Sequence, residues 1–185
     1  MHEFVDRLAG SRDVLSGVDQ ALEQEFEARL VESSTLAVRV AYSVLRRRED
    51  AEDVAQEAFA RAYRAFAQLR DRQRFRAWLV RTTWRLAINR WRADRRRSAR
   101  ETAHAKTRRP EPTTEETVDG RRRAAELWRA IDTLPEKLRI VIVLASIEGH
   151  DIAEVAALLG LPAGTVKSRL FLARQRLKEQ LQWTR

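Results

Sequence analysis

Residues 164–174, with the sequence GTVKSRLFLAR, have the side chains needed to bind DNA without any covalent chemistry. Lysine and arginine can pair with phosphates, while serine and apolar side chains can contact base edges. At 100° per residue, a helix through this stretch has an apolar face formed by Val166, Leu170, Ala173 and Leu177. The outward face carries Lys167, Ser168, Phe171, Leu172, Arg174 and Gln175. The pattern predicts a recognition helix that enters the major groove.

The preceding residues supply the other half of a helix-turn-helix motif. Asp151, followed three residues later by Glu154, is a helix start signal ahead of an apolar run. Gly160 and Pro162 then break that helix, because glycine tolerates left-handed dihedrals and proline cannot continue the hydrogen-bond ladder. We expect the second helix to begin near Thr165. The alternative, a surface helix with solvated charges, does not explain why the break and the basic face occur together.

A second set of DNA-binding side chains lies in the middle of the chain. Residues 70–109 contain 15 basic and 3 acidic residues, the excess expected where phosphate is bound. Residues 75–92 can be drawn as one helix whose core face is Leu79, Val80, Thr83, Trp84, Leu86, Ala87 and Trp91. Opposite them lie Trp78, Arg81, Arg85, Ile88, Asn89 and Arg92, followed by Arg95, Arg96 and Arg97.

This mixture favours a helix that contacts partly opened DNA. Guanidinium groups suit phosphates and base edges, and an indole can stack on an unpaired base. For Trp78, packing in the core is an equal alternative. The arginines at 95–97 could also form a merely solvated helix end, although the basic residues around them favour phosphate contact.

An acidic patch precedes the basic segment. Asp50, Asp53 and Glu57 fall on one side of a predicted helix. Catalysis or metal binding is not supported, because no nucleophile, histidine or glycine-rich phosphate loop accompanies these carboxylates. DNA would repel such a face, so a docking surface for another protein and a plain solvated face remain as the two interpretations.

Composition predicts an all-α, intracellular protein. Among the 185 residues, no proline precedes Pro110 and no glycine lies between Gly17 and Gly120, which argues for long helices. Cysteine is absent and the three histidines are far apart in sequence, so we expect no disulfide and no zinc site. No apolar run is long enough to span a bilayer and no signal peptide is evident, so we expect a cytoplasmic protein without membrane insertion.

Four segments are expected. Helical periodicity runs over residues 18–97 and again over 121–185, which predicts two small helical domains. Residues 98–120 contain few aliphatic side chains and two prolines, so they cannot bury enough apolar surface to order and should form a flexible linker. The role of residues 1–17 stays open.

Together these segments resemble the extracytoplasmic-function (ECF) sigma factors of bacterial RNA polymerase. Residues 50–59, DAEDVAQEAF, look like the helix of this family that binds core polymerase. Residues 75–97 look like the segment that melts and reads the −10 promoter element. Residues 134–139 (LPEKLR), 147–149 (IEG) and 164–169 (GTVKSR) look like the domain that reads the −35 element.

The resemblance implies a role for each set of residues. Core polymerase would be bound by Asp50, Asp53, Gln56 and Glu57, with the β′ clamp helices and the β flap as partner surfaces. The −10 element would be bound by Phe75, Trp78, Arg81, Arg85, Asn89, Arg92 and Arg96. The −35 element would be bound by Thr165, Lys167, Ser168, Phe171 and Arg174. An anti-sigma factor is a further implied partner, and no catalytic residue, metal or cofactor is implied.

Several positions depart from the family pattern. Arg85 stands where members commonly have asparagine, Thr82 and Thr83 replace a common Ile-Ala pair, and Leu172 stands where an outward arginine is common. These departures leave the promoter sequence open. Leu172 offers an apolar contact, for instance to a thymine methyl, instead of a guanidinium fork.

Two other functions compete with that of a promoter-specificity subunit. A stand-alone helix-turn-helix regulator would explain the C-terminal block but not residues 50–97, and no dimerisation heptad is evident. An enzyme acting on nucleic acid would need a metal or nucleophile constellation, which the sequence does not show.

Overall fold

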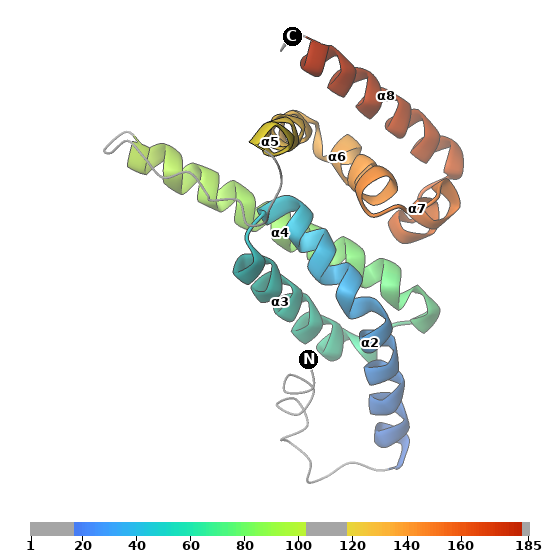
Figure 1. The fold of residues 1–185 in the computed structure, drawn as a ribbon. Coiled ribbons are helices and arrows are strands. Elements are labelled where there is room, and N and C mark those ends of the chain that lie inside the picture. The colour runs from blue at the N-terminus through green and yellow to red at the C-terminus, as the bar shows by residue number, and fades with distance from the viewer. Residues whose placement is uncertain (1–16, 103–117, 183–185) are drawn as a thin grey trace. The chain divides into compact units, whose positions relative to one another are not determined.

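The computed structural model describes residues 17–102 and 118–182, and all regular elements in these ranges are helices (Figure 1). The predicted all-α class is confirmed. The chain divides into two compact units between Ala87 and Ile88, a point that lies inside one long helix. Most of the predicted N-terminal segment 1–17 lies outside the described residues, as do 103–117 and 183–185.

The first unit is built on two helices that lie side by side, α2 (Gly17–Leu45) and α3 (Arg48–Phe66) (Figure 1). Their buried residues recur every three or four positions, so each helix has one apolar stripe. The core of this unit combines aromatic rings with small side chains, among them Ala37, Ala55 and Ala58. Small residues between large ones let the helices approach closely while the rings fill the remaining volume.

The connection between α2 and α3 is very short. Arg46 has a left-handed backbone, with φ 58°, and its N–H still donates to the carbonyl of Tyr42 (2.9 Å). A left-handed residue is a common way to end a helix, although glycine usually occupies that position. The Arg46 guanidinium donates to the carbonyl of Ser43 (2.7 Å). The arginine therefore closes the last turn of α2 with its own side chain.

The first unit continues through the turn η1 (Arg72–Arg74) into α4 (Phe75–Thr102). The single helix predicted over residues 75–92 is present and extends further. Three rings clamp its first turn, because Phe26, Phe66 and Phe75 contact one another edge-to-face with centroids 5.2–5.8 Å apart. Edge-to-face pairs are favourable beyond their buried area. The cluster thus fixes where α4 begins relative to α2 and α3.

The second unit contains the remaining helices, which are α5 (Val118–Thr133), α6 (Glu136–Ile142), the π-helical turn η2 (Val143–Ile147), α7 (Ile152–Leu159) and α8 (Ala163–Gln182). Helix α8 contacts α5, α6 and α7 (Figure 1). Pro135 and Pro162 directly precede α6 and α8, so α8 begins at Ala163, two residues before the start expected near Thr165. Because α4 reaches Thr102 and α5 begins at Val118, both ends of the predicted 98–120 linker are helical.

A buried arginine ties α6 to the end of α5. Arg139 is buried, and its guanidinium donates to the carbonyls of Asp132 and Leu134, the latter at 3.1 Å. Burial lowers the pKa of Arg139, although the nearby carboxylates of Asp132 and Glu136 oppose the shift. The carbonyls that it caps lie at the end of a helix, where backbone acceptors have no partner of their own.

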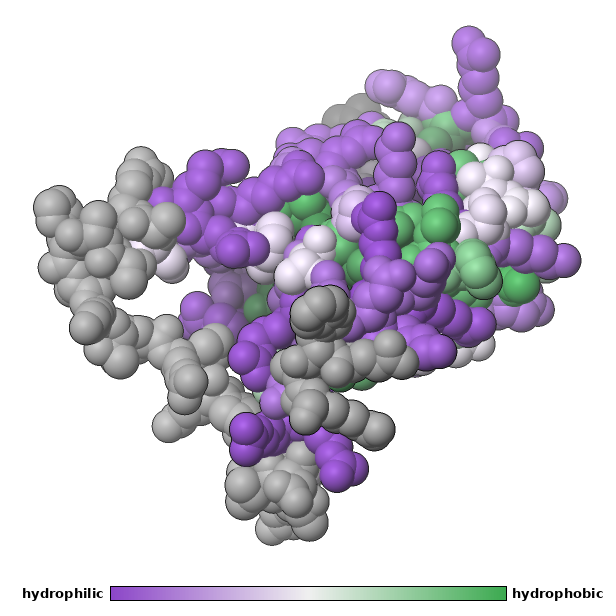
Figure 2. Space-filling model, turned by 90° about the horizontal axis from the view of Figure 1, so that it is seen from above, coloured by the Kyte–Doolittle hydropathy of each residue, from purple (hydrophilic) through white to green (hydrophobic). Residues whose placement is uncertain are grey.

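The helices are covered mainly by polar side chains. Hydrophilic residues make up most of the face seen in Figure 2, in keeping with a charged content of 34%. Within residues 17–102 and 118–182, no single helix is long and apolar enough to cross a membrane.

Candidate nucleic-acid interface

The predicted helix-turn-helix is formed by α7 and α8. Asp151 caps α7: its carboxylate accepts from the N–H of Glu154 (2.8 Å), and the Glu154 carboxylate accepts from the N–H of Asp151 (3.0 Å). Gly160 ends the helix with φ 66°. The two helix axes are bent by 107°, within the range of helix-turn-helix motifs. The start signal and the break expected from the sequence are thus confirmed.

Helix α8 has the two faces that the periodicity predicted. Its buried side chains are Val166, Leu170, Ala173 and Leu177. Its exposed side chains include Lys167, Ser168, Phe171, Leu172, Arg174 and Gln175. Thr165 is half-buried at the start of the helix, where its carbonyl accepts from the Ser168 hydroxyl (3.1 Å). Four of the five predicted −35 residues therefore face solvent, and Thr165 lies at the edge of this surface.

Helix α4 gathers most of the predicted −10 residues into one stripe. Steps of three or four residues place them on the same side of the helix. The stripe runs through Trp78, Arg81, Arg85, Asn89, Arg92 and Arg96. Trp78 and Arg81 are half-buried, while the other four are exposed. Trp78, the aromatic residue of the stripe, also packs against the core of the first unit, and part of its side chain is still accessible.

Two residues expected on this surface are buried instead. Phe75 is 1% exposed, because its ring lies in the cluster with Phe26 and Phe66. It supports the stripe from within the core and cannot be part of the exposed surface. Ile88 is also buried, at 2% exposure, although the helical periodicity placed it outward.

Arg92 already has a carboxylate partner within the second unit. Its guanidinium lies 2.7 Å from the carboxylate of Glu136 at the start of α6. Both side chains are exposed, and exposed ion pairs contribute only ~0–1 kcal/mol. A phosphate can therefore compete with Glu136 for this arginine.

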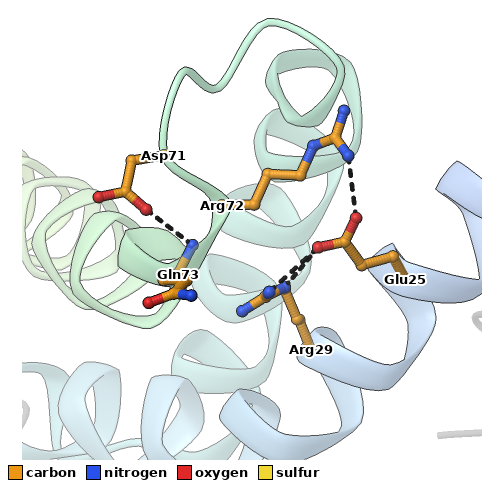
Figure 3. A network of polar contacts seen from close by, with 5 residues as sticks. All are labelled: Glu25, Arg29, Asp71, Arg72 and Gln73. Carbon is orange, nitrogen blue, oxygen red and sulfur yellow. Dashed lines mark hydrogen bonds and ion pairs between the residues drawn. The ribbon is translucent and has the colours of Figure 1, made fainter.

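A polar network fixes the turn between α3 and α4 (Figure 3). Glu25 of α2 accepts from Arg72 in the turn (2.9 Å) and from Arg29 on its own helix (3.0 Å). Asp71 caps the turn by accepting from the N–H of Gln73 (3.0 Å). Sequence reasoning missed Glu25, because nothing in the sequence links two positions 47 residues apart.

The same network sets the ionisation of Glu25. Partial desolvation pushes the pKa of Glu25 upward, but the hydrogen bonds and charges of Arg29 and Arg72 together outweigh it. The pKa of Glu25 is therefore lower than its ordinary value. The carboxylate stays charged at neutral pH and holds the turn that leads into α4.

The predicted docking residues lie on α3, where Asp53, Gln56 and Glu57 are exposed and Asp50 is half-buried. The surface is less acidic than the sequence indicated. Arginine side chains pair with its carboxylates at Arg47–Asp50 (3.3 Å), Arg48–Glu52 (2.8 Å) and Arg61–Glu57 (2.6 Å). Each arginine lies three or four residues from its carboxylate partner in the sequence. This spacing could have predicted the ion pairs.

Comparison with known proteins assigns both units. Residues 30–97 match Sigma-70 region 2, and residues 124–177 match Sigma-70, region 4. The ECF RNA polymerase sigma-E factor of Escherichia coli is 32% identical over 154 residues, which cover 72% of this chain and 74% of that protein. The chain belongs to the ECF sigma factors of the sigma-70 family. This membership favours an RNA polymerase sigma factor, which directs promoter-specific transcription, over a stand-alone regulator.

Other sigma factors are similarly related. ECF sigma factor SigE of Mycolicibacterium smegmatis is 33% identical over 88% of this chain, which spans 64% of that protein. Among solved structures, CnrH in complex with the cytosolic domain of CnrY has a TM-score of 0.59 and 26% identity, and the alignment covers 96% of this chain and 95% of CnrH. Sigma factor RpoE, solved with anti-sigma factor NepR from Bartonella quintana, shares the fold, with a TM-score of 0.55 and 23% identity over 88% of this chain and 99% of RpoE.

Proposed function

We propose that this sigma factor docks on core RNA polymerase through α3, captures the −10 element with α4 and sets the −35 register with α8. It supplies specificity and no catalytic chemistry of its own. The observation that carries the proposal is the presence, on one chain, of an exposed polar face on α3, a basic stripe on α4 and a helix-turn-helix.

In the docking step, polymerase replaces ion pairs that the free protein already makes. Asp53, Gln56 and Glu57 project from α3 and would contact the β′ clamp helices, with Asp50 at their edge. Glu57 would exchange Arg61 for a cation of the polymerase. An exposed intrahelical pair costs little to break, so this exchange is feasible. The second unit would in turn contact the β flap.

In the −10 step, α4 presents cations and an indole to DNA that is being opened. Arg85, Arg92 and Arg96 are exposed along the stripe and suit phosphates or base edges. Trp78 is half-buried at the end of the stripe nearest the core, where a flipped base could stack on its accessible part. Asn89 lies between these arginines and can hydrogen-bond a base edge.

In the −35 step, α8 enters the major groove of duplex DNA. Lys167 and Arg174 are exposed on the outward side and would contact phosphates or base edges. Each DNA contact is modest alone, and polymerase strengthens both by holding the two modules on one scaffold. The site of action is the cytoplasm, and an anti-sigma factor is a further partner by analogy with RpoE, which was solved with NepR.

The proposal is tested by run-off transcription with core polymerase on templates with randomised −35 and −10 elements. We expect transcripts from a defined class of templates that depend on the sigma factor. The combined variant Asp53→Ala, Gln56→Ala and Glu57→Ala should lose co-purification with core polymerase. A matched control carries Gln24→Ala, Glu32→Ala and Glu179→Ala, all at exposed positions elsewhere, and should bind normally. Equal binding by both variants would refute the docking surface.

A further inference from the structure

Over residues 168–175 the middle of the outward face of α8 is uncharged, and Glu179 follows further along the same side. At 100° per residue, Ser168, Phe171, Leu172 and Gln175 form a compact group in which neighbours are three or four residues apart. Exposed cations flank this group on both sides, with Lys167, Arg174 and Lys178 on one side and Arg176 on the other. The group therefore faces the groove floor if the helix enters the groove, while the flanking cations face a sugar–phosphate strand.

Two large apolar side chains dominate this group. Phe171 is 67% exposed and Leu172 is 46% exposed. Neither can turn inward, because the buried side of α8 is already filled by Val166, Leu170 and Ala173. Adjacent exposed apolar side chains at a recognition surface indicate an apolar partner.

Base chemistry identifies that partner. In the major groove, only thymine presents an apolar group, its C5 methyl, whereas guanine is usually read by a bidentate arginine or lysine. No cation stands within the central group, and glutamine, the type at Gln175, pairs with adenine. In the free protein the Ser168 hydroxyl donates to the Thr165 carbonyl.

We infer that Phe171 and Leu172 read the −35 element through thymine methyl groups, which makes Leu172 a specificity-determining residue of this sigma factor. The inference rests on the proposed function, because it requires α8 to lie in the major groove. It predicts A·T pairs at the two base steps opposite these side chains. Arginine at position 172 would instead favour guanine.

The test replaces thymine with deoxyuridine, which removes the methyl group and leaves base pairing unchanged. The −35 element is first selected from a randomised library by transcription with core polymerase. Each thymine, on either strand, is then replaced in turn. Burial of one methyl group corresponds to a roughly fourfold change in affinity. At subsaturating polymerase, we expect transcription to fall about fourfold when the thymine at either of two base steps is replaced. Replacement of any other thymine should leave transcription unchanged.

Variants assign each methyl group to a side chain. Leu172→Ala should abolish the difference between thymine and uracil at one step, and Phe171→Ala should abolish it at the other. Both side chains are exposed, so neither variant should unfold the protein. Lys178→Ala is the matched control and should weaken thymine and uracil templates equally. In a repeated selection, Leu172→Arg should shift one step towards guanine.

The outcomes separate this inference from the proposed function. Sigma-dependent transcription that is equal on thymine and uracil templates would overturn methyl reading and leave Phe171 and Leu172 as a surface for a protein partner. Selection of an element without thymine would overturn it as well. Absence of transcription from every template would refute the proposed function, and the inference with it.

Discussion

Phe75 provides a direct test of whether the start of α4 belongs to the DNA-binding surface or to the core. Its ring is 1% exposed and makes edge-to-face contacts with Phe26 (5.8 Å) and Phe66 (5.5 Å). Truncation of a fully buried phenylalanine costs about 3–5 kcal/mol, which is a large part of the stability of a small domain. We therefore expect Phe75→Ala to be largely unfolded at 37 °C.

Phe75→Leu separates stability from DNA contact. Leucine keeps apolar volume but loses both ring contacts, each worth about 0.5–1.5 kcal/mol, so the expected loss is about 1–3 kcal/mol. Urea unfolding followed by circular dichroism measures this loss. In run-off transcription at 15 °C, where the variant remains folded, activity should equal that of wild type. Unchanged stability combined with reduced opening of the −10 element would refute the core assignment and return Phe75 to the DNA surface.

Three further predictions concern stability. Thr83 is fully buried, and its hydroxyl has no hydrogen-bond partner among the described residues. Thr83→Val should therefore stabilise the protein by about 1 kcal/mol and raise its Tm, whereas Thr83→Ser should not. An unchanged Tm for the valine variant would show that the hydroxyl has a partner. Gly160 has φ 66°, so Gly160→Ala should cost about 1–2 kcal/mol in thermal unfolding, whereas Gly164→Ala, at a glycine without a positive φ and with open space for a Cβ, should not destabilise the protein. Because the folded-state pKa of Glu25 is lowered, its contribution is present above the ordinary value of 4.5 and is lost as pH falls through the folded pKa. Glu25→Gln should thus be less stable than wild type at pH 7 and converge with it only as the pH falls through the lowered folded-state pKa of Glu25. Parallel pH profiles would contradict this.

Periodic segments were predictable because their faces repeat over several turns. The inward and outward residues of α8 follow directly from the spacing of Val166, Leu170 and Ala173. Phe75, the first residue of α4, was expected on the −10 surface because of the family resemblance, not because of periodicity, and it is buried. No preceding helical turn fixes its direction, and the turn at 72–74 brings its ring beneath α2 and α3. Contacts distant in sequence, such as Glu25 with Arg72, leave no periodic signal at all.

Ile88 shows a second limit of sequence reasoning. Its neighbours in the stripe, Arg85 and Asn89, are exposed, yet Ile88 is buried. Periodicity alone does not fix how broad the buried arc of a helix is. The ion pairs between the α3 carboxylates and arginines could, in contrast, have been predicted from the spacing of these residues in the sequence.

The ion pairs between arginines and carboxylates on α3 predict that salt should weaken the complex with polymerase less than the complex with DNA. Docking that exchanges Arg61 for a polymerase cation leaves the number of ion pairs at Glu57 the same before and after. DNA binding, by comparison, releases condensed counterions from phosphates, and its equilibrium constant falls steeply with ionic strength. A rise in potassium concentration would therefore strip promoter DNA from the holoenzyme well before it separates the sigma factor from polymerase.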